Sequence, residues 1–235
     1  MKLTHISRTE ITSKTLTQLL QQAQTGDFIS LLKLKQRDDS GWWRPHPDGV
    51  VVRNGNKLVL NGRVTLLVLE RKPNHWEISP QGEVILQYGR EIWLGNKSRI
   101  CLLDERDQFC CRWEPCENGV IVERSHTFQL FLNNKRRIYE GEQEGFAWQW
   151  HPKGFVVHLS DHNRFLLNGK TLLYDGEYTS WEGHEKGVII QRGADLFLNG
   201  KEFIYRMSDS DVQWSRHQYG ALIQEGDEIL LAVAK

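Results

Sequence analysis

The sequence predicts a single all-β domain built from six copies of one four-stranded antiparallel unit, preceded by one short helix. Three observations support this prediction: a tryptophan–glycine spacing that recurs along the chain, Asn-Gly turns between short apolar runs, and incomplete units at the two ends. Self-similarity with a period of roughly 20 to 50 residues is the mark of repeat architectures. The repeat therefore decides the fold class more strongly than composition does.

The chain starts with a segment, residues 1–26, that we expect to hold one short amphipathic helix. Gly26 is suited to follow the last helical turn. We expect the helix to pack on its own domain, and the alternative that it detaches to bind a partner stays open. Four apolar side chains recur there with the spacing of one helix face: Leu16, Leu19, Leu20 and Ala23.

Six tryptophans mark the repeated units. Each is followed six residues later by a glycine, and the spacings between successive tryptophans are 33, 37, 35, 33 and 33 residues. The glycine usually opens an apolar run rich in β-branched residues, such as residues 50–52, which is typical of a buried strand. The six pairs are Trp43/Gly49, Trp76/Gly82, Trp113/Gly119, Trp148/Gly154, Trp181/Gly187 and Trp214/Gly220.

The units also contain a hairpin signal. An apolar triplet runs into Asn-Gly at residues 58–62, 165–169 and 196–200, and a second apolar run follows. Asn-Gly accommodates the positive φ angles of a type I′ turn and is the strongest short hairpin signal. Each unit is therefore expected to form a meander of four strands: a carries the tryptophan, b follows the glycine, and c and d flank the Asn-Gly turn.

The two ends of the chain complement each other. The last unit stops after its third strand, at residues 229–233, and an unassigned apolar strand, residues 28–34, precedes the first tryptophan. This strand can serve as strand d of the last unit and close a ring, which removes exposed sheet edges. Four-stranded units repeated radially form a β-propeller. We therefore predict a six-bladed β-propeller over residues 27–235, closed by its N-terminal strand.

Across residues 28–235 the pattern resembles that of β-propeller repeat proteins, and its architecture is similar to that of WD40 proteins in general terms. The Gly-His and Trp-Asp signature of WD40 repeats is absent, as is the double glycine of kelch repeats. The resemblance therefore implies the fold and a general role as a rigid platform for partners. It transfers no catalytic residues.

Composition narrows the classes of partner. Lys and Arg number 30 and Asp and Glu also number 30, so the formal net charge is zero. Proteins that bind nucleic acids or anionic membranes usually carry a basic excess, so we expect neither kind of partner. No apolar run is long enough to span a bilayer, and the first residues lack the apolar region of a secretory signal.

Cysteines and motifs point to a cytoplasmic protein without catalytic activity. The four cysteines, Cys101, Cys110, Cys111 and Cys116, lie in one short stretch without a C-x-x-C pair, so we expect reduced thiols. No nucleophile elbow, phosphate-binding loop or zinc-protease motif occurs. We therefore expect no enzyme activity and no cofactor.

One repeated position is a candidate ligand ring. The third residue after the repeated tryptophan is His46, Ser79, Cys116, His151, His184 or His217. A ring of imidazoles could bind a metal ion or an anion. The alternative, which we favour, is that each residue caps its own turn by local hydrogen bonding, and we assign no metal.

Two further groups are candidates for a partner surface. Three tryptophans fall outside the repeat, Trp42, Trp93 and Trp150. The second group is acidic and lies in the connections from strand d to the next strand a: Asp38, Asp39, Glu70, Asp104, Glu105, Asp107, Glu140, Glu142, Glu144, Asp175, Glu177, Asp209 and Asp211. The turns at the other end of the strands are richer in Lys and Arg, among them Lys97, Lys135, Arg136, Lys153 and Lys170.

These observations predict a non-catalytic intracellular binding or scaffold module that presents one face of the propeller to a protein partner. The alternative is a module that binds a small ligand, a glycan or an anion, in repeated pockets. An enzyme centred on the propeller channel is the third possibility. A fold alone does not determine function, so all three remain open at this point.

Overall fold

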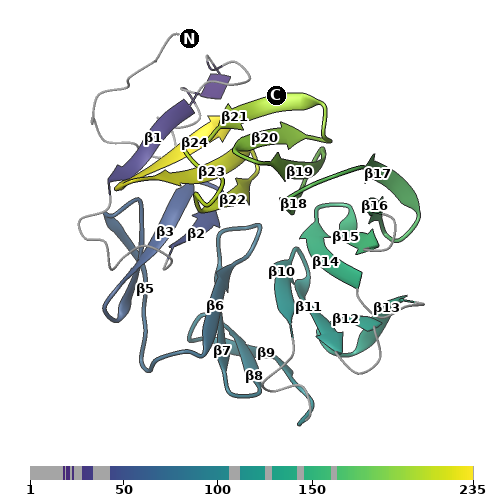
Figure 1. Cartoon of the computed structure of the whole chain (residues 1–235). Helices are drawn as coiled ribbons and strands as arrows, with labels where there is room; N and C mark the ends of the chain where they lie inside the picture. Colours follow the sequence, from purple (N-terminus) through teal and green to yellow (C-terminus); the bar gives the residue numbers. More distant parts are fainter. Residues whose placement is uncertain are drawn as a thin grey trace. The chain divides into compact units, whose positions relative to one another are not determined.

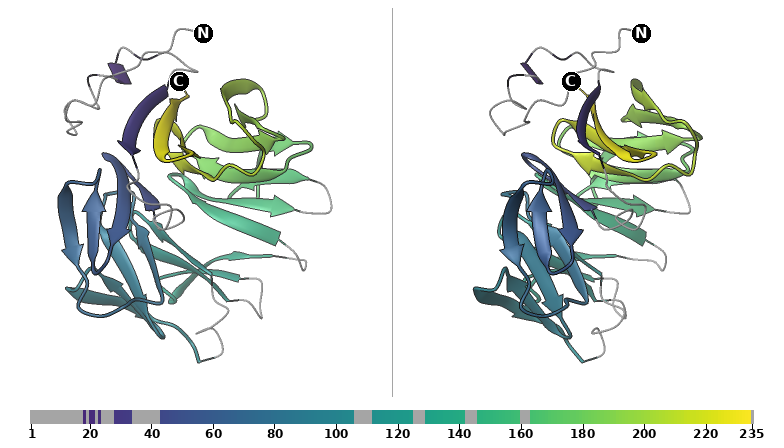
Figure 2. Two further views of the ribbon diagram at one scale, coloured as in Figure 1. Left: turned by 60° about the vertical axis from the view of Figure 1, so that its left-hand side comes forward. Right: turned by 90° about the vertical axis from the view of Figure 1, so that its left-hand side faces the viewer.

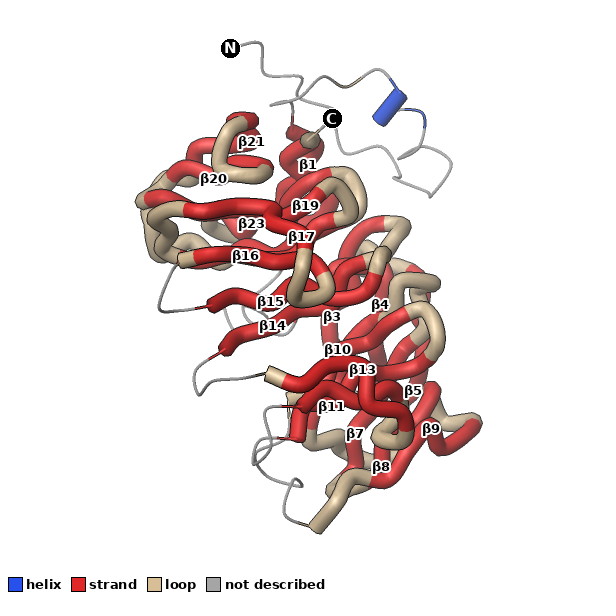
Figure 3. Tube along the Cα trace, turned by 90° about the vertical axis from the view of Figure 1, so that its right-hand side faces the viewer, coloured by secondary structure: helices blue, strands red, loops and turns tan. Residues whose placement is uncertain are grey.

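The structure is a computed structural model that describes residues 18, 20, 21, 23, 28–33, 43–105, 112–124, 129–141, 146–159 and 163–234. These residues form an all-β, six-bladed β-propeller of four-stranded antiparallel sheets (Figure 1), and the last repeated unit supplies three strands of its sheet. Strands and tight turns make up nearly all of the described chain (Figure 3). The chain divides into two compact units at residues 66/67 and 175/176.

Unit 1, residues 1–66 and 176–235, holds three sheets, except for the last two residues of β5. The sheets are formed by β2 (Trp43–His46), β3 (Gly49–Asn54), β4 (Lys57–Leu60) and β5 (Val64–Val68); by β18 (Ser180–His184), β19 (Gly187–Arg192), β20 (Asp195–Leu198) and β21 (Glu202–Arg206); and by β22 (Trp214–His217), β23 (Gly220–Glu225), β24 (Glu228–Val233) and β1 (Phe28–Lys33). The innermost strands β18, β22 and β2 contact each other in that order.

Unit 2, residues 67–175, holds the other three sheets. They are formed by β6 (His75–Ile78), β7 (Val84–Tyr88), β8 (Glu91–Leu94) and β9 (Ser98–Leu102); by β10 (Trp113–Cys116), β11 (Gly119–Arg124), β12 (Gln129–Leu132) and β13 (Arg136–Glu140); and by β14 (Phe146–His151), β15 (Gly154–Leu159), β16 (Arg164–Leu167) and β17 (Thr171–Asp175). The innermost strands β6, β10 and β14 contact each other in that order.

The Asn of the c–d turn explains the Gly six residues after the tryptophan. In the first sheet, Asn61 Oδ1 accepts a hydrogen bond from the Val50 N–H (3.0 Å), and Asn61 Nδ2 donates to the Asp48 carbonyl (3.0 Å). Gly49 has φ 139°, and a Cβ atom there would overlap the Asn61 side chain. Only glycine fits both requirements. The same arrangement recurs at Asn133, Asn168 and Asn199.

The repeated tryptophans join neighbouring sheets. In unit 1 the Nε1–H of Trp43 donates to Gln224 Oε1 (2.9 Å), and that of Trp214 donates to Gln191 Oε1 (2.8 Å). In unit 2 the equivalent bonds run from Trp113 to Gln87 (2.7 Å) and from Trp148 to Glu123 (2.7 Å). Each acceptor lies near the end of strand b in the preceding sheet. Each of these indoles therefore fills the space between two sheets and satisfies its one polar atom there.

The N-terminal predictions fall mostly outside the described residues. Residues 18, 20 and 21 are helical, and the buried Leu20 and Ala23 pack in a cluster with Trp43 and Leu231. The rest of the expected helix and the domain boundary at residues 26/27 are not among the described residues, so both stay predictions. β1 pairs antiparallel with β24 (Figure 2), and ring closure through this pair also stays a prediction.

Candidate binding pocket beside Trp150

The six residues of the candidate ligand ring share one role in their own turns. Nδ1 of each histidine accepts a hydrogen bond from the backbone N–H two residues later: Asp48 for His46 (3.0 Å), Lys153 for His151 (3.0 Å), Lys186 for His184 (3.3 Å) and Tyr219 for His217 (3.3 Å). Ser79 Oγ accepts from the Gln81 and Glu83 N–H groups (3.3 and 3.0 Å), and Cys116 from that of Asn118. Imidazole, hydroxyl and thiol thus cap the same turn.

This role bears on the metal hypothesis. A ring nitrogen that accepts a backbone hydrogen bond is not free to bind a metal ion at the same time. Within the described part of the chain, no three His, Cys, Asp or Glu side chains are grouped so that they could hold a metal ion. The structure therefore brings the six positions into equivalent turns, and a ligand shared among them stays a hypothesis.

In unit 1 the turn residues also tie one sheet to the next. His217 Nε2 lies 2.8 Å from the His46 carbonyl oxygen, and Gln218 Nε2 donates to the Pro47 carbonyl (3.0 Å). Because Nδ1 of His217 accepts a hydrogen bond, Nε2 carries the proton and donates it to His46. Burial lowers the pKa of His217 to about 4, which keeps the ring neutral at neutral pH. We call the place where His217 and Gln218 bond to the next sheet the closed junction.

The equivalent junction in unit 2 lacks both donors. Cys116 and Glu117 take the places of His217 and Gln218 in the repeat. A thiol is shorter than an imidazole, and a carboxylate has no proton to donate to the carbonyls of the next sheet. A cavity of about 210 Å³ lies at this place, between the sheets of β10–β13 and β14–β17. We call this place between the two sheets the open junction.

The cavity has apolar walls and a polar rim. Its apolar wall is formed by Ile121, Leu132, Ile138, Trp150 and Phe155. Cys116, Glu117, Asn118, Arg136, His151, Pro152 and Gly154 complete the lining. Burial raises the pKa of the Cys116 thiol, the Asn118 N–H opposes that rise and the Glu117 carboxylate adds to it, so the sulfur faces the pocket as a neutral thiol.

Trp150 is held in place through its backbone. Its N–H donates to Glu114 Oε2 on β10 (2.7 Å), and Arg112 Nη2 donates to the other oxygen of the same carboxylate (2.7 Å). The indole is half-buried and lines the pocket. The structure thus brings together three of the residues that the sequence singled out, Trp150, Cys116 and His151.

The other two tryptophans outside the repeat do not contribute to this pocket. Trp93 is half-buried on β8, and its Nε1–H donates to Glu91 Oε2 (3.3 Å). Trp42 is outside the described residues.

The acidic connections are exposed, and part of their charge is neutralised locally. Glu105 pairs with Arg90 (3.2 Å) and Asp104 with Arg124 (3.4 Å). Arg124 ends strand b of its sheet and Arg90 lies in the turn after strand b, at the same end of the sheets as the acidic connections. The charge at that end is therefore mixed. The described acids Glu70, Asp104, Glu105, Glu140, Asp175, Glu177, Asp209 and Asp211 are all exposed. Asp38, Asp39, Asp107, Glu142 and Glu144 lie outside the described residues.

Comparison with known proteins adds no relative. No protein-family model matches this sequence, and a search of the curated proteins finds no match. No helix in the described part of the chain is long and apolar enough to cross a membrane. The candidate site therefore rests on the geometry of the open junction.

Proposed function

We propose that the protein is a non-catalytic interaction module, and that the pocket beside Trp150 receives one side chain from a segment of a protein partner. The observation that carries this proposal is the size and lining of the pocket. Pockets for drug-sized ligands and cofactors measure roughly 300 to 1,000 Å³, whereas this one measures about 210 Å³. That volume suits a single large side chain, because an apolar cavity of about 150 Å³ already holds a benzene ring.

The chemistry of the lining favours binding over catalysis. Nδ1 of His151 accepts the Lys153 N–H (3.0 Å), and the Cys116 thiol is neutral. A nucleophilic cysteine needs a lowered pKa, and the environment of Cys116 has the opposite effect. The walls provide apolar contact area, which drives association without chemistry.

A second candidate function is the binding of a small organic anion. The Arg136 guanidinium lies at the rim of the pocket and is suited to a carboxylate. The closed junction in unit 1 has hydrogen bonds where the open junction has the cavity. Such a ligand would therefore bind at the open junction and not at the closed one.

We also propose that β1 closes the ring as the fourth strand of the last blade. Phe28 lies opposite Ala232 in the β1–β24 pair. Oxidation of a double variant, Phe28→Cys with Ala232→Cys, is expected to form a disulfide that raises the Tm. A pair that stays reduced under oxidising conditions would contradict closure.

Site-specific photo-crosslinking in the native host tests the interaction. A photoreactive residue in place of Glu117, at the rim of the pocket, is expected to give a discrete protein adduct, and Trp150→Ala in the same chain should abolish it. The same residue in place of Glu177, on an acidic d–a connection, is the matched control. An adduct at Glu177 but not at Glu117 would move the interface to the acidic connections and overturn the assignment to the pocket.

A further inference from the structure

We infer that the segment bound at the open junction is an acidic peptide segment with one large apolar side chain, which enters the pocket beside Trp150. This inference rests on the proposed function and adds the chemical class of the partner.

The walls of the pocket determine the kind of side chain that enters. Ile121, Leu132 and Ile138 come from three adjacent strands of one sheet, and Trp150 and Phe155 come from two strands of the next. Burying a large aliphatic or aromatic side chain against such walls contributes about 1.5 to 3 kcal/mol. A charged or amide side chain would lose hydration there without gaining partners from these walls.

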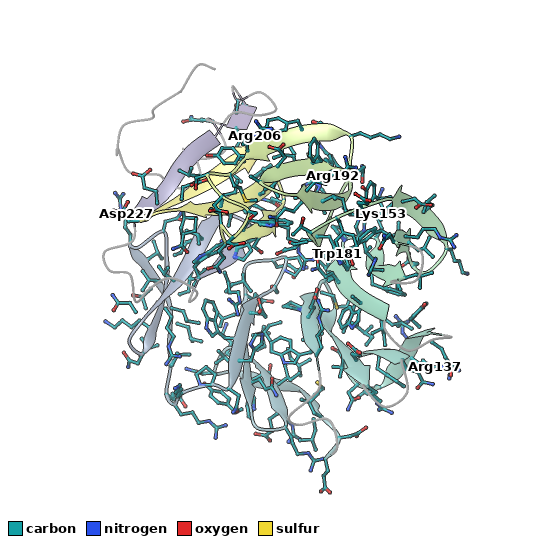
Figure 4. The ribbon with its side chains drawn as sticks, viewed as in Figure 1. Arg137, Lys153, Trp181, Arg192, Arg206 and Asp227 are labelled. Atoms are coloured by element: carbon teal, nitrogen blue, oxygen red, sulfur yellow. The ribbon has the colours of Figure 1, made fainter. Side chains whose placement is uncertain are left out.

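The rim of the pocket determines the charge of the peptide residues on either side of the apolar side chain. Lys135 is in the β12–β13 turn, Arg136 is the first residue of β13, Lys153 is in the β14–β15 turn, and all three side chains are exposed. Across the described residues, none of the three takes part in an ion pair. Their neighbour Arg137, by contrast, pairs with Glu140 (2.9 Å); Figure 4 labels Arg137 and Lys153. Of the three cations, Arg136 lines the pocket, and Lys135 and Lys153 are each adjacent in sequence to a lining residue. The lining contains one carboxylate, that of Glu117.

The basic character continues along the neighbouring turns of unit 2. The residue after the two central turn positions is Lys97, Lys135 or Lys170 in its three sheets. Each of these lysines donates its backbone N–H to the carbonyl three residues earlier, at 3.0 Å, so the three turns share one conformation. All three side chains are exposed. An acidic segment that leaves the pocket in either direction therefore meets further cations, which favours fast and selective association.

Single-stranded nucleic acid is the competing occupant, because bases stack on tryptophan and phosphates bind lysine. Two observations favour the peptide. The pocket walls opposite Trp150 are aliphatic and give the edges of a base no hydrogen-bond partner. The Glu117 carboxylate at the rim repels a phosphate more strongly than it repels a peptide, whose carboxylates can be placed elsewhere along the segment.

Three pools of short synthetic peptides test the inference by fluorescence anisotropy with the full chain. The first pool has a central Leu, Ile, Met or Phe flanked on each side by three Asp or Glu residues. The second has the same central residues flanked by Asn and Gln. The third has acidic flanks and a central Gly. We expect the first pool to bind about ten-fold more tightly than the second at low salt, and the third pool not to saturate.

Three variants assign the effect to the site. The triple variant Lys135→Gln/Arg136→Gln/Lys153→Gln should bind the first and second pools equally. The matched control, Arg63→Gln/Lys186→Gln/Lys201→Gln, removes three cations from equivalent turns of unit 1 and should keep the ten-fold difference. Trp150→Ala should weaken the binding of both pools that have an apolar centre.

The possible outcomes separate the two proposals. Equal binding of the first two pools to the unaltered protein would overturn the acidic partner and leave the pocket as a binding site. Failure of both pools to bind in a Trp150-dependent manner would overturn the proposed function as well. Displacement of the first pool by a single-stranded oligothymidylate at equal phosphate and carboxylate concentration would reassign the surface to nucleic acid.

Discussion

The closed junction of unit 1 and the open junction of unit 2 occupy equivalent places in the repeat and differ, among other positions, in two turn residues. At the closed junction His217 and Gln218 donate hydrogen bonds to the carbonyls of His46 and Pro47 (2.8 and 3.0 Å). At the open junction their places are taken by Cys116 and Glu117, beside a cavity of about 210 Å³. The repeated backbone thus forms equivalent junctions between sheets, and the side chains in the turns decide which junction contains a cavity.

The change at the open junction leaves the repeat frame intact. Cys116 still caps its turn by accepting the Asn118 N–H, as His217 does with Tyr219. Trp148 still donates to Glu123 across the open junction. Because the turn cap and the tryptophan contact persist, a pocket can form there without loss of the fold.

The largest effect on stability is expected from the tryptophan that spans the open junction. Trp148→Ala should lower the free energy of unfolding by about 4 kcal/mol, because a fully buried indole is lost. Trp150→Ala, two residues away and half-buried, should cost about 1 kcal/mol. Urea unfolding followed by far-UV circular dichroism measures both, and similar losses in the two variants would show that Trp150 is a structural residue.

The closed junction should weaken in acid. The pKa of His217 is about 4 in the folded protein and lies below its ordinary value of 6.5, so the unfolded chain binds the proton first. Stability from this group is therefore complete above pH 6.5 and is lost as the pH falls to 4, by about 3 kcal/mol. The measurement is urea unfolding between pH 4 and 7.

His217→Asn is the control for this pH dependence, because an asparagine can cap the same turn and does not titrate. The difference in unfolding free energy between the unaltered protein and this variant should shrink by about 3 kcal/mol as the pH falls from 6.5 to 4. A difference that stays constant with pH would rule out His217 as the titrating group.

Introducing the open-junction residues into unit 1 tests whether two residues make the difference. The variant His217→Cys/Gln218→Glu removes both donors and should lower the free energy of unfolding by about 2 kcal/mol. It should also remove the acid sensitivity described for His217. If stability is unchanged, the hydrogen bonds to His46 and Pro47 do not hold the two sheets together.

The reverse exchange should have the smallest effect on stability and the clearest effect on binding. Cys116→His/Glu117→Gln introduces two donors opposite the carbonyls of His151 and Pro152 and should raise the free energy of unfolding by about 1 kcal/mol. The same variant should lose binding of the peptide pool with acidic flanks and apolar centres. Thermal unfolding and anisotropy measure the two effects, and retained binding would show that the cavity does not depend on these residues.

The sequence allowed the repeat to be predicted because each structural requirement recurs in every unit. The spacing from Trp43 to Gly49 and the turn at Asn61 were both visible, but their connection was not. Only the folded chain shows that the Asn61 side chain occupies the space that a Cβ atom on Gly49 would need.

The site could be predicted only in part. Trp150 stood out as a tryptophan outside the repeat, and Cys116 as an odd member of the histidine position. The pocket itself depends on donors of one sheet facing carbonyls of the next, which no single unit of sequence displays. The arginines beside the acidic connections were overlooked because they are not in the d–a connections: Arg124 ends strand b, and Arg90 lies in the turn between strands b and c.

The asparagines of the c–d turns have a consequence for the chemical ageing of the protein. Asn-Gly is the dipeptide at which deamidation is fastest, because the glycine N–H can attack the asparagine side chain. In the folded chain both polar atoms of Asn199 are held, Oδ1 by Val188 N–H and Nδ2 by the Lys186 carbonyl (both 3.0 Å). Conversion to Asp would replace that donor with an acceptor facing a carbonyl. The lifetime of the intact asparagine amides therefore depends on the rate at which each turn opens.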